Sequence, residues 1–396
     1  MVFPLDGIRV IDLTQYQQGP VATQMLADMG AEVIKVEPRG AGEPARLFGS
    51  AYFQANNRNK KSITVDIRTE KGKEIICRLV GKSDVFAQNF RPGVAERLRF
   101  GYEALSRINP RIIYLTGSAY GLKGSMGNKP GFDGVGQAMS GILSTIWSPE
   151  GFPPTSMGCS ISDQTGAFML AFGAMVALFH RERTGVGQEV DVSLLGSTMA
   201  LVGWTFERHL REGQTAAIKV PGARVARQIS GISLISSHFA RDGKPLILHL
   251  ARRPMQEKCF EVLGLKGLLT DPRSEDKEKV QEYAEDVLKA LSQKIRTKDR
   301  DEWLRLFEEA GVIAAPIHEL DEAAAHPQVL ANEYIVEVDH PIDGRLRILG
   351  LPVKLHKTPG KVGLAPELGR HTDEVLTGVA GYSLEEIVRM RQEEII

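Results

Sequence analysis

The sequence predicts an α/β protein with a large parallel-sheet domain and a smaller α+β domain. Two observations predict the large domain: short β-branched runs alternate with helix-length segments, and glycine or proline separates them. Such alternation favours a parallel sheet covered by helices on both faces. A third observation predicts the smaller domain, because from about residue 223 strands follow one another directly and a charged helical stretch comes next. The large domain is therefore Rossmann-like in pattern.

The first elements surround a turn near the start of the chain. Ile8 to Leu13 is a short strand, and Gly19-Pro20 then breaks the chain. Val21 to Met29 is a helix that ends at Gly30, where glycine is the usual stop. A second strand covers residues 31–36.

The same alternation continues over the next eighty or so residues. We expect strands at residues 62–66, 84–87 and 112–116, with a helix from Thr69 to Val80.

Gly166 to His180 is apolar almost all round, which is typical of a helix that is buried on every side. Its fifteen residues are fewer than the roughly 20 that a membrane span needs. A strand from Glu189 to Leu194 follows a Thr-Gly-Val-Gly turn.

We predict that residues 1–222 form the first part of the large domain, 223–316 the small domain, and 317–396 a return segment that completes the large domain. In the small domain, residues 229–238 and 245–250 are expected strands, and 274–309 is helical. Its apolar stripe consists of Trp303, Leu304, Leu306 and Phe307. A hairpin is expected between Ile335 and Leu351.

Composition excludes several classes of protein. Lysine plus arginine equals aspartate plus glutamate at 49 each, whereas nucleic-acid-binding proteins usually carry a basic excess. The start, MVFPLDGIRVIDL, has no secretory signal pattern, and no run is long and apolar enough for a membrane span. The three cysteines form no CxxC pair and no metal-ligand spacing. We therefore expect a cytoplasmic protein with no metal, nucleic-acid or membrane partner.

The first strand, turn and helix, followed by a strand that ends in Glu37, resemble the start of a dinucleotide-binding domain. However, the turn from Thr14 to Pro20 lacks G-x-G-x-x-G, so the backbone cannot approach a pyrophosphate closely in the usual way. An NAD-linked oxidoreductase is therefore the last of the alternatives.

Several segments, spread nearly from end to end, resemble one known family, and the resemblance is weakest between residues 214 and 236. The segments are Leu5–Leu13, Gln17–Pro20, Gly30–Pro38, Asn59–Asp66, Gln88–Gly93, Lys129–Asp133, Ser162–Ser193, Leu349–Gly360 and Leu368–Leu376. Their combination resembles the class III CoA-transferases, the CaiB/BaiF-like group that includes formyl-CoA transferase and carnitine CoA-transferase. The resemblance implies a dimer of interlocked ring-like chains.

Asp163 matches the family's catalytic aspartate, which precedes a buried apolar helix. The resemblance implies that its carboxylate attacks an acyl-CoA to give an aspartyl anhydride, and that CoA then forms an aspartyl thioester. An aspartate with a reference pKa near 3.9 is ionised in the cell, and the helix start favours the anion. From pattern alone, an aspartate at a helix start is more often a helix N-cap.

The resemblance also implies binding roles for other residues. Gln17 matches a glutamine beside the reacting acyl group, where an amide donates to an oxyanion. The alternative is a turn glutamine that bonds local backbone. The residues that match CoA-binding positions are Arg39, Arg68, Asn89, Phe90, Arg97 and Lys129. Each basic residue alone is otherwise read as a surface charge.

Two departures from the family's sequence pattern narrow the range of expected reactions and substrates. Family racemases place a histidine where this chain has Phe132, before Asp133, and phenylalanine cannot transfer a proton. The formyl-CoA transferase branch has a run of glycines where this chain has only Gly222, which makes an oxalate-type substrate doubtful. Arg224 or Arg227 is a candidate for binding a larger or second carboxylate.

We therefore expect a CoA-transferase of the EC 2.8.3 type, with no tightly bound cofactor and with CoA and acyl-CoA as substrates. The donor is expected to be succinyl-CoA or another dicarboxylyl-CoA. The expected assembly is a homodimer, or a hetero-oligomer with a paralogous subunit. Alternatives are an intramolecular CoA transferase, an α-methylacyl-CoA racemase, or a catalytically silent subunit, against which the presence of Asp163 argues.

Overall fold

The computed structural model describes residues 2–146, 148, 151–213, 217–220, 223–228, 231–276, 278–341 and 344–396. Contacts divide the chain into two compact units, which are considered separately. The large unit comprises Met1–Gly141, Ser156–Leu201 and Pro327–Ile396, and the small unit comprises Ile142–Thr155 and Val202–His326. The boundaries expected from the sequence lie after residues 222 and 316, and they stay a prediction.

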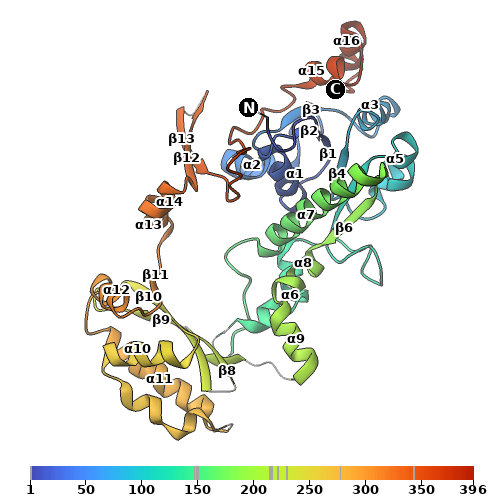
Figure 1. Cartoon of the computed structure of the whole chain (residues 1–396). Coiled ribbons are helices and arrows are strands. Elements are labelled where there is room, and N and C mark those ends of the chain that lie inside the picture. The colour runs from blue at the N-terminus through green and yellow to red at the C-terminus, as the bar shows by residue number, and fades with distance from the viewer. Residues whose placement is uncertain are drawn as a thin grey trace. The chain divides into compact units, whose positions relative to one another are not determined.

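The large unit contains the expected parallel sheet (Figure 1). Its strands are β1 (Arg9–Asp12), β2 (Glu32–Glu37), β3 (Lys61–Thr64), β4 (Val85–Gln88), β5 (Ile113–Ser118) and β6 (Glu189–Ser193). They lie in the order β3-β2-β1-β4-β5-β6, and every neighbouring pair is parallel. This is the doubly wound order, in which the direction of progression reverses between the first and fourth strands. The predicted α/β class is confirmed.

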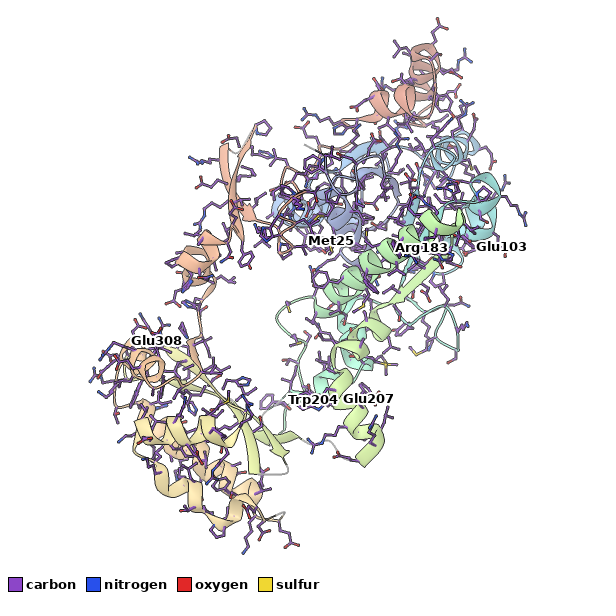
Figure 2. All side chains as sticks on the ribbon, viewed as in Figure 1. Met25, Glu103, Arg183, Trp204, Glu207 and Glu308 are labelled. Carbon is purple, nitrogen blue, oxygen red and sulfur yellow. The ribbon has the colours of Figure 1, made fainter. Side chains whose placement is uncertain are left out.

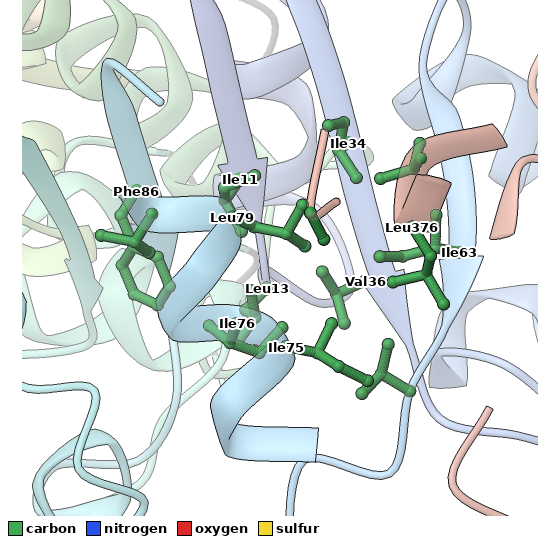
Figure 3. Close-up of a cluster of buried hydrophobic side chains, with 14 of the residues drawn as sticks. Ile11, Leu13, Ile34, Val36, Ile63, Ile75, Ile76, Leu79, Phe86 and Leu376 are labelled. Atoms are coloured by element: carbon green, nitrogen blue, oxygen red, sulfur yellow. The ribbon is translucent and has the colours of Figure 1, made fainter. Parts of the chain in front are cut away.

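Alternation along the strands gives the sheet two apolar faces. Ile11 and Ile34 face one side, where α3 (Glu70–Val80) packs, together with helices close to the C-terminus (Figure 3). Val10 and Val33 face the other side, in the cluster that includes residues of α1 (Gln18–Asp28) and α7 (Ile161–Thr184). These side chains are at most 1% exposed, and burying each contributes about 1.5–3 kcal/mol.

The structure extends two of the helices that the sequence predicts. α1 begins at Gln18, three residues before the expected start, and Gln17 is its N-cap residue. α3 follows the prediction closely, with the Thr69 hydroxyl accepting from the Gly72 N–H at 2.9 Å. α7 has 24 residues and is followed by the C-cap residue Gly185, whose φ of 77° is left-handed. Figure 2 draws the described side chains, and Arg183 marks the last turn of α7.

Within the single chain, α7 is not buried on every side as expected. Small residues such as Ala167, Ala174 and Ala177 face the core, where close approach to the sheet and α1 leaves little room. Large apolar residues lie on the other face and are 42–66% exposed: Phe168, Met169, Phe172, Met175, Val176 and Phe179. These six residues are called the α7 apolar face below. Apolar composition alone does not reveal which face has a partner within the chain.

Among the described residues, α7 is the one helix with the length and hydropathy of a membrane span, and half of its apolar window is buried in the protein. Its buried half packs against α1 and the sheet, as in the core helix of a globular α/β protein.

The small unit is built on an antiparallel sheet with helices. Its strands, in the order β11-β10-β9-β8-β7, are β7 (Ala217–Val220), β8 (Ala223–Gln228), β9 (Gly231–Phe239), β10 (Pro245–Leu250) and β11 (Ala314–Pro316). The expected strands at residues 229–238 and 245–250 correspond to β9 and β10. The helical stretch contains α11 (Val280–Ile295) and α12 (Arg300–Glu309), and Trp303 and Phe307 of α12 are buried.

The other elements are short. They are η1 (Pro44–Phe48), α2 (Ser50–Asn57), α4 (Val94–Arg97), α5 (Tyr102–Ile108), α6 (Asp133–Met139), η2 (Ile142–Thr145), α8 (Leu194–Leu201), α9 (Gly203–Glu212), α10 (Arg253–Leu263), η3 (Lys266–Thr270), η4 (Pro272–Ser274), α13 (Leu320–Ala325), α14 (Pro327–Ala331), α15 (Thr372–Gly378) and α16 (Leu384–Gln392). The expected hairpin consists of β12 (Ile335–His340) and β13 (Gly344–Leu349). Gly222 and the side chains of Arg224 and Arg227 lie outside the described residues.

Candidate active site

A cavity of about 350 Å³ lies where the strand order reverses. It is lined by residues 15–18 and 89–92, which follow β1 and β4, and by residues 117–119 at the carboxyl end of β5. Ligand sites of open parallel sheets form at this position, because the segments after neighbouring strands diverge there. All of the lining residues belong to the large unit.

Asp163 lines this cavity from the first turn of α7. Two backbone N–H groups of that turn, from Ser162 and Asp163, donate to Asp133 Oδ1 at 2.8 and 3.1 Å. The other Asp133 oxygen accepts from Gln137 Nε2 at 2.5 Å. Asp133 therefore satisfies the helix start, and the N-cap residue of α7 is Ser160. The N-cap interpretation of Asp163 does not fit this arrangement.

The ionisation of Asp163 differs from the sequence-based assumption. Burial, and secondarily the nearby Asp133 carboxylate, raise the pKa of Asp163 from 3.8 to about 7. The assumption that Asp163 has the ordinary aspartate pKa is therefore wrong. At neutral pH the carboxyl is poised between its two protonation states, which is a common property of reactive groups.

Gln17 is 8% exposed and lines the same cavity. Its side chain makes no capping bond to α1, and its Oε1 accepts from the Tyr52 hydroxyl at 3.3 Å. Burial, and secondarily the Asp163 charge, raise the pKa of Tyr52 to about 12, so this hydroxyl remains a donor. With the amide oxygen engaged, the Gln17 NH₂ is the end available to a ligand. Among the described residues, no hydrogen bond from the Gln17 side chain to local backbone supports the alternative that Gln17 only stabilises the turn.

The segment before Gln17 is held by the neighbouring strand. Asn89 Oδ1 accepts from the Gln15 N–H at 2.8 Å, and Asn89 Nδ2 donates to the Gln15 carbonyl at 2.9 Å. Tyr16 follows with φ of 65°, in the left-handed region. Phe90 also lines the cavity, and its N–H donates to Gln88 Oε1 at 2.8 Å.

Phe132 stands on the cavity wall in place of a proton-transfer residue. Its ring lies 5.4 Å from the Tyr16 ring at an interplanar angle of 89°, which is an edge-to-face contact. Phe132 is 59% exposed, so an apolar surface is available beside Asp163.

The structure separates the predicted basic residues into two groups. Lys129 lines the cavity together with Arg91, which the sequence analysis did not single out although it lies in the matching segment Gln88–Gly93. Arg39, Arg68 and Arg97 are not among the lining residues.

The three arginines outside the cavity have different surroundings. Arg39 donates to the Glu394 carbonyl, and Arg68 pairs with Asp66 at 2.8 Å. Arg97 is exposed on α4. Their roles in CoA binding stay predictions.

Within the described residues, no group of three or more histidine, cysteine, aspartate or glutamate side chains is placed to hold a metal ion. The lining of the cavity presents carboxylate, amide, phenol and cationic groups.

The chain is similar to known proteins over nearly its whole length. The model of CoA-transferase family III matches residues 5–372. The chain is 36% identical to the acetyl-CoA:oxalate CoA-transferase of Acetobacter aceti, over 92% of this chain and 93% of that protein. It is 31% identical to the succinyl-CoA–D-citramalate CoA-transferase of Chloroflexus aurantiacus, over 99% and 98%. The crystal structure of a CAIB/BAIF family protein from Brucella suis has a TM-score of 0.79 at 28% identity, covering 96% of this chain and 100% of that one.

Proposed function

The chain belongs to CoA-transferase family III and is a class III CoA-transferase, and from this premise we propose that Asp163 carries the transferred groups covalently. The observation that carries the proposal is the position of Asp163. Its carboxyl lines the cavity at the strand-order reversal, outside the capping bonds of its own helix and beside the amide of Gln17.

The first half of the proposed reaction consists of two exchanges of anions. An Asp163 oxygen attacks the thioester carbonyl and the C–S bond breaks. CoA departs as a thiolate, and an acyl–aspartyl anhydride remains on the enzyme. The thiolate then attacks the Asp163 carbonyl, the anhydride C–O bond breaks, and the donor acid leaves as a carboxylate. The product on the enzyme is an aspartyl-CoA thioester.

The second half runs the same bonds in reverse with the acceptor. The acceptor carboxylate attacks the aspartyl thioester and releases thiolate, which attacks the acyl carbonyl of the new anhydride. A new acyl-CoA leaves, and Asp163 is restored as a carboxylate. Each step uses one anion and releases another, so no general acid or base is needed, and Phe132 is acceptable where a racemase needs histidine.

Gln17 supports these steps as a neutral hydrogen-bond donor. Each tetrahedral intermediate carries an oxyanion, which an amide NH₂ stabilises without giving up a proton. Tyr52 orients the amide by donating to its oxygen. Loss of such a donor typically costs about 100-fold or more in kcat.

For CoA recognition we propose Asn89, Phe90 and Lys129, which line the cavity, together with Arg39, Arg68 and Arg97. Guanidinium and ammonium groups suit the phosphates of CoA. The proposed donor remains succinyl-CoA or another dicarboxylyl-CoA, which the name of the second relative supports. The oxalate and citramalate in the two names support a dicarboxylic acid as the acceptor. Because one relative acts on oxalate, oxalate belongs among the acceptors to be tested despite the single Gly222.

We further propose a cytoplasmic homodimer, without a tightly bound cofactor, in which the α7 apolar face is covered by the second chain. A contiguous exposed apolar face of this kind is typical of an interaction surface. A hetero-oligomer with a paralogous chain is the alternative, and the residues of the α7 apolar face do not distinguish the two.

The test is an exchange experiment on the purified full-length chain. Succinyl-CoA or acetyl-CoA is incubated with isotopically labelled oxalate, citramalate or succinate, and label in the acyl-CoA pool is followed. We expect ping-pong kinetics and loss of exchange in Asp163→Asn. Isomerisation of a single acyl-CoA without acceptor would instead favour a racemase or an intramolecular transferase, and exchange at the wild-type rate in Asp163→Asn would contradict the proposal.

A further inference from the structure

We propose that Glu43, a buried carboxylate outside the cavity, is a positioning residue that holds the Tyr16–Gln17 turn in the conformation that presents the Gln17 amide to the reacting group. The inference rests on the proposed role of Gln17 as an oxyanion donor. It assigns to Glu43 a function in the reaction without contact to the substrate.

The contact that carries the proposal is a hydrogen bond to the backbone. Glu43 Oε2 accepts from the Tyr16 N–H at 3.0 Å. Tyr16 has φ of 65°, a conformation that residues with a side chain adopt only when their surroundings impose it. Asn56 Nδ2 also donates to the Tyr16 carbonyl, at the long distance of 3.4 Å. Glu43 therefore provides the shorter of the two bonds to the backbone of this strained residue.

The charge of Glu43 is balanced by the buried Lys35, which also binds the backbone of the same loop. Glu43 is 1% exposed, and its Oε1 lies 3.2 Å from Lys35 Nζ. Lys35 is fully buried on β2, and its Nζ also donates to the Thr14 carbonyl at 2.9 Å. The pair thus fixes the loop on both sides of Gln15, whose backbone is held in turn by Asn89.

A second buried ion pair holds the other end of the segment. Lys60 Nζ lies 2.9 Å from Asp12 Oδ2 and donates to the Pro20 carbonyl at 2.8 Å. Both side chains are fully buried. Gln17 thus lies between two anchored stretches of backbone, one before it through Lys35 and Glu43 and one after it through Lys60.

Other charged groups face Lys35 and help to keep it ionised. Burial alone would lower the pKa of Lys35, but Asp12, Glu43 and Glu37 together raise it above its ordinary value. Glu37 also accepts from the Glu43 N–H at 3.1 Å and pairs with Arg46. Lys35 therefore remains a cation, and Glu43 is its partner on the side of the active-site loop.

Glu43→Gln is the informative substitution because it changes charge without changing size. Glu43 Oε1 faces Lys35, and Oε2 accepts from the N–H groups of Tyr16 and Ala45. The amide of glutamine has a single oxygen, so an NH₂ group faces either Lys35 or these two N–H groups. The Tyr16–Gln17 turn can then relax, and the Gln17 amide is no longer held in position. We expect kcat to fall about 10- to 100-fold, and KM for acyl-CoA to change little because Asn89 and Lys129 are untouched.

A double-mutant cycle separates positioning from general damage. Kinetics and thermal midpoints are measured for wild type, Glu43→Gln, Gln17→Ala and the double variant. We expect Glu43→Gln to have no further effect on kcat once Gln17 is absent, because the carboxylate acts through that amide. Asp84→Asn is the matched control: Asp84 pairs with the buried Arg181 at 2.9 Å just before β4, at the amino ends of the strands, and its kcat should stay within about twofold.

Additive losses of kcat in the double variant, or a wild-type kcat in Glu43→Gln, would overturn the inference. If Glu43→Gln does not fold, Glu43→Asp replaces it in the same double-mutant cycle. The shorter side chain keeps a negative charge for Lys35 and moves the carboxylate away from the Tyr16 N–H. A failure of the proposed function would be seen in a different variant. If the covalent role of Asp163 is wrong, Asp163→Asn retains exchange activity, and this result does not depend on the behaviour of Glu43→Gln.

Discussion

Two carboxyl groups meet at the start of α7: Asp163 belongs to its first turn, and Asp133, the first residue of α6, accepts from two N–H groups of that turn. The Asp133 carboxylate accepts from backbone N–H groups and from Gln137, whereas the carboxyl of Asp163 is largely buried and lines the cavity. Unequal surroundings of this kind separate two like groups into different roles. Asp133 stabilises the helix start, and Asp163, whose carboxyl is outside those capping bonds, is left to face the cavity.

The raised pKa of Asp163 predicts the acid limb of the pH profile. Only ionised Asp163 attacks, so kcat/KM should fall about tenfold per pH unit below the pKa of about 7. In Asp133→Asn the second charge is gone but burial remains. The pKa of Asp163 should therefore decrease, and the acid limb should move to lower pH.

The measurement is kcat/KM between pH 5 and pH 9 for wild type and Asp133→Asn. The asparagine retains an oxygen for the N–H groups of Ser162 and Asp163, so the helix start is preserved. Asp84→Asn serves as control and should leave the limb in place. An unchanged limb in Asp133→Asn would mean that this carboxylate does not act on Asp163.

Tyr52 offers a second test at the same scale. Tyr52→Phe removes the hydroxyl that donates to Gln17 Oε1 at 3.3 Å and leaves the ring in its contact with Phe48. The amide is then free to rotate, and we expect kcat to fall about tenfold, or about 1.4 kcal/mol, with little change in KM. Equal rates for the two proteins would show that the hydroxyl does not orient Gln17.

The single-residue features were only partly predictable from the sequence. Asp163 and Gln17 were identified by resemblance, and the structure brings them to one cavity. The partners that define their chemistry are distant in sequence: Asp133 is 30 positions from Asp163, and Tyr52 is 35 positions from Gln17. Local pattern carries no information on such contacts, which is why the pKa of Asp163 was assumed to be ordinary.

At the scale of elements, α1 and α7 meet beside the cavity because small residues permit it. A Cβ at Gly166 of α7 would lie 2.7 Å from Gln18 Nε2 and 3.1 Å from its Cγ. A Cβ at Gly117, near the end of β5, would lie 2.7 Å from Gln18 Oε1. Gln18 is therefore confined between two glycines, and it has no room to move away from either.

Gly166→Ala should disturb this packing. We expect the free energy of unfolding to fall by about 1–3 kcal/mol, as for other overpacked sites, and kcat to fall because Gln18 adjoins Gln17. Gly378→Ala is the matched control, since it is helical and its Cβ would meet no atom within 4 Å. Denaturant unfolding of both variants checks the prediction, and equal stabilities would contradict it.

The strands and helices of the sheet were predictable, because apolar alternation and breaks at Gly30 or Gly19-Pro20 are local signals. The exposed face of α7 was not. The sequence of an all-apolar helix is the same whether its second face contacts the same chain or another one, so burial of that face within the chain was wrongly predicted.

At the scale of the whole molecule, the proposed homodimer places the α7 apolar face against the second chain. Phe172 is 66% exposed and Phe179 is 60% exposed. Phe172→Glu would place a charge in a covered apolar interface, so we expect the dimer to weaken at least tenfold, or by about 1.4 kcal/mol. Sedimentation velocity at micromolar concentrations measures this.

Val388→Glu is the control for the association experiment. Val388 is 52% exposed on α16, away from the α7 apolar face, and its substitution should leave association unchanged. A wild-type chain that sediments as a monomer would contradict the proposed dimer.

The most direct measurement concerns the covalent chemistry of the whole enzyme. The full-length chain is incubated with succinyl-CoA or acetyl-CoA, quenched with hydroxylamine, and analysed by peptide mass spectrometry. We predict a hydroxamate at Asp163 that requires the acyl-CoA and is absent from Asp163→Asn, because only an activated carboxyl reacts with hydroxylamine. An unmodified Asp163 peptide in a preparation that is actively transferring CoA would contradict the covalent mechanism.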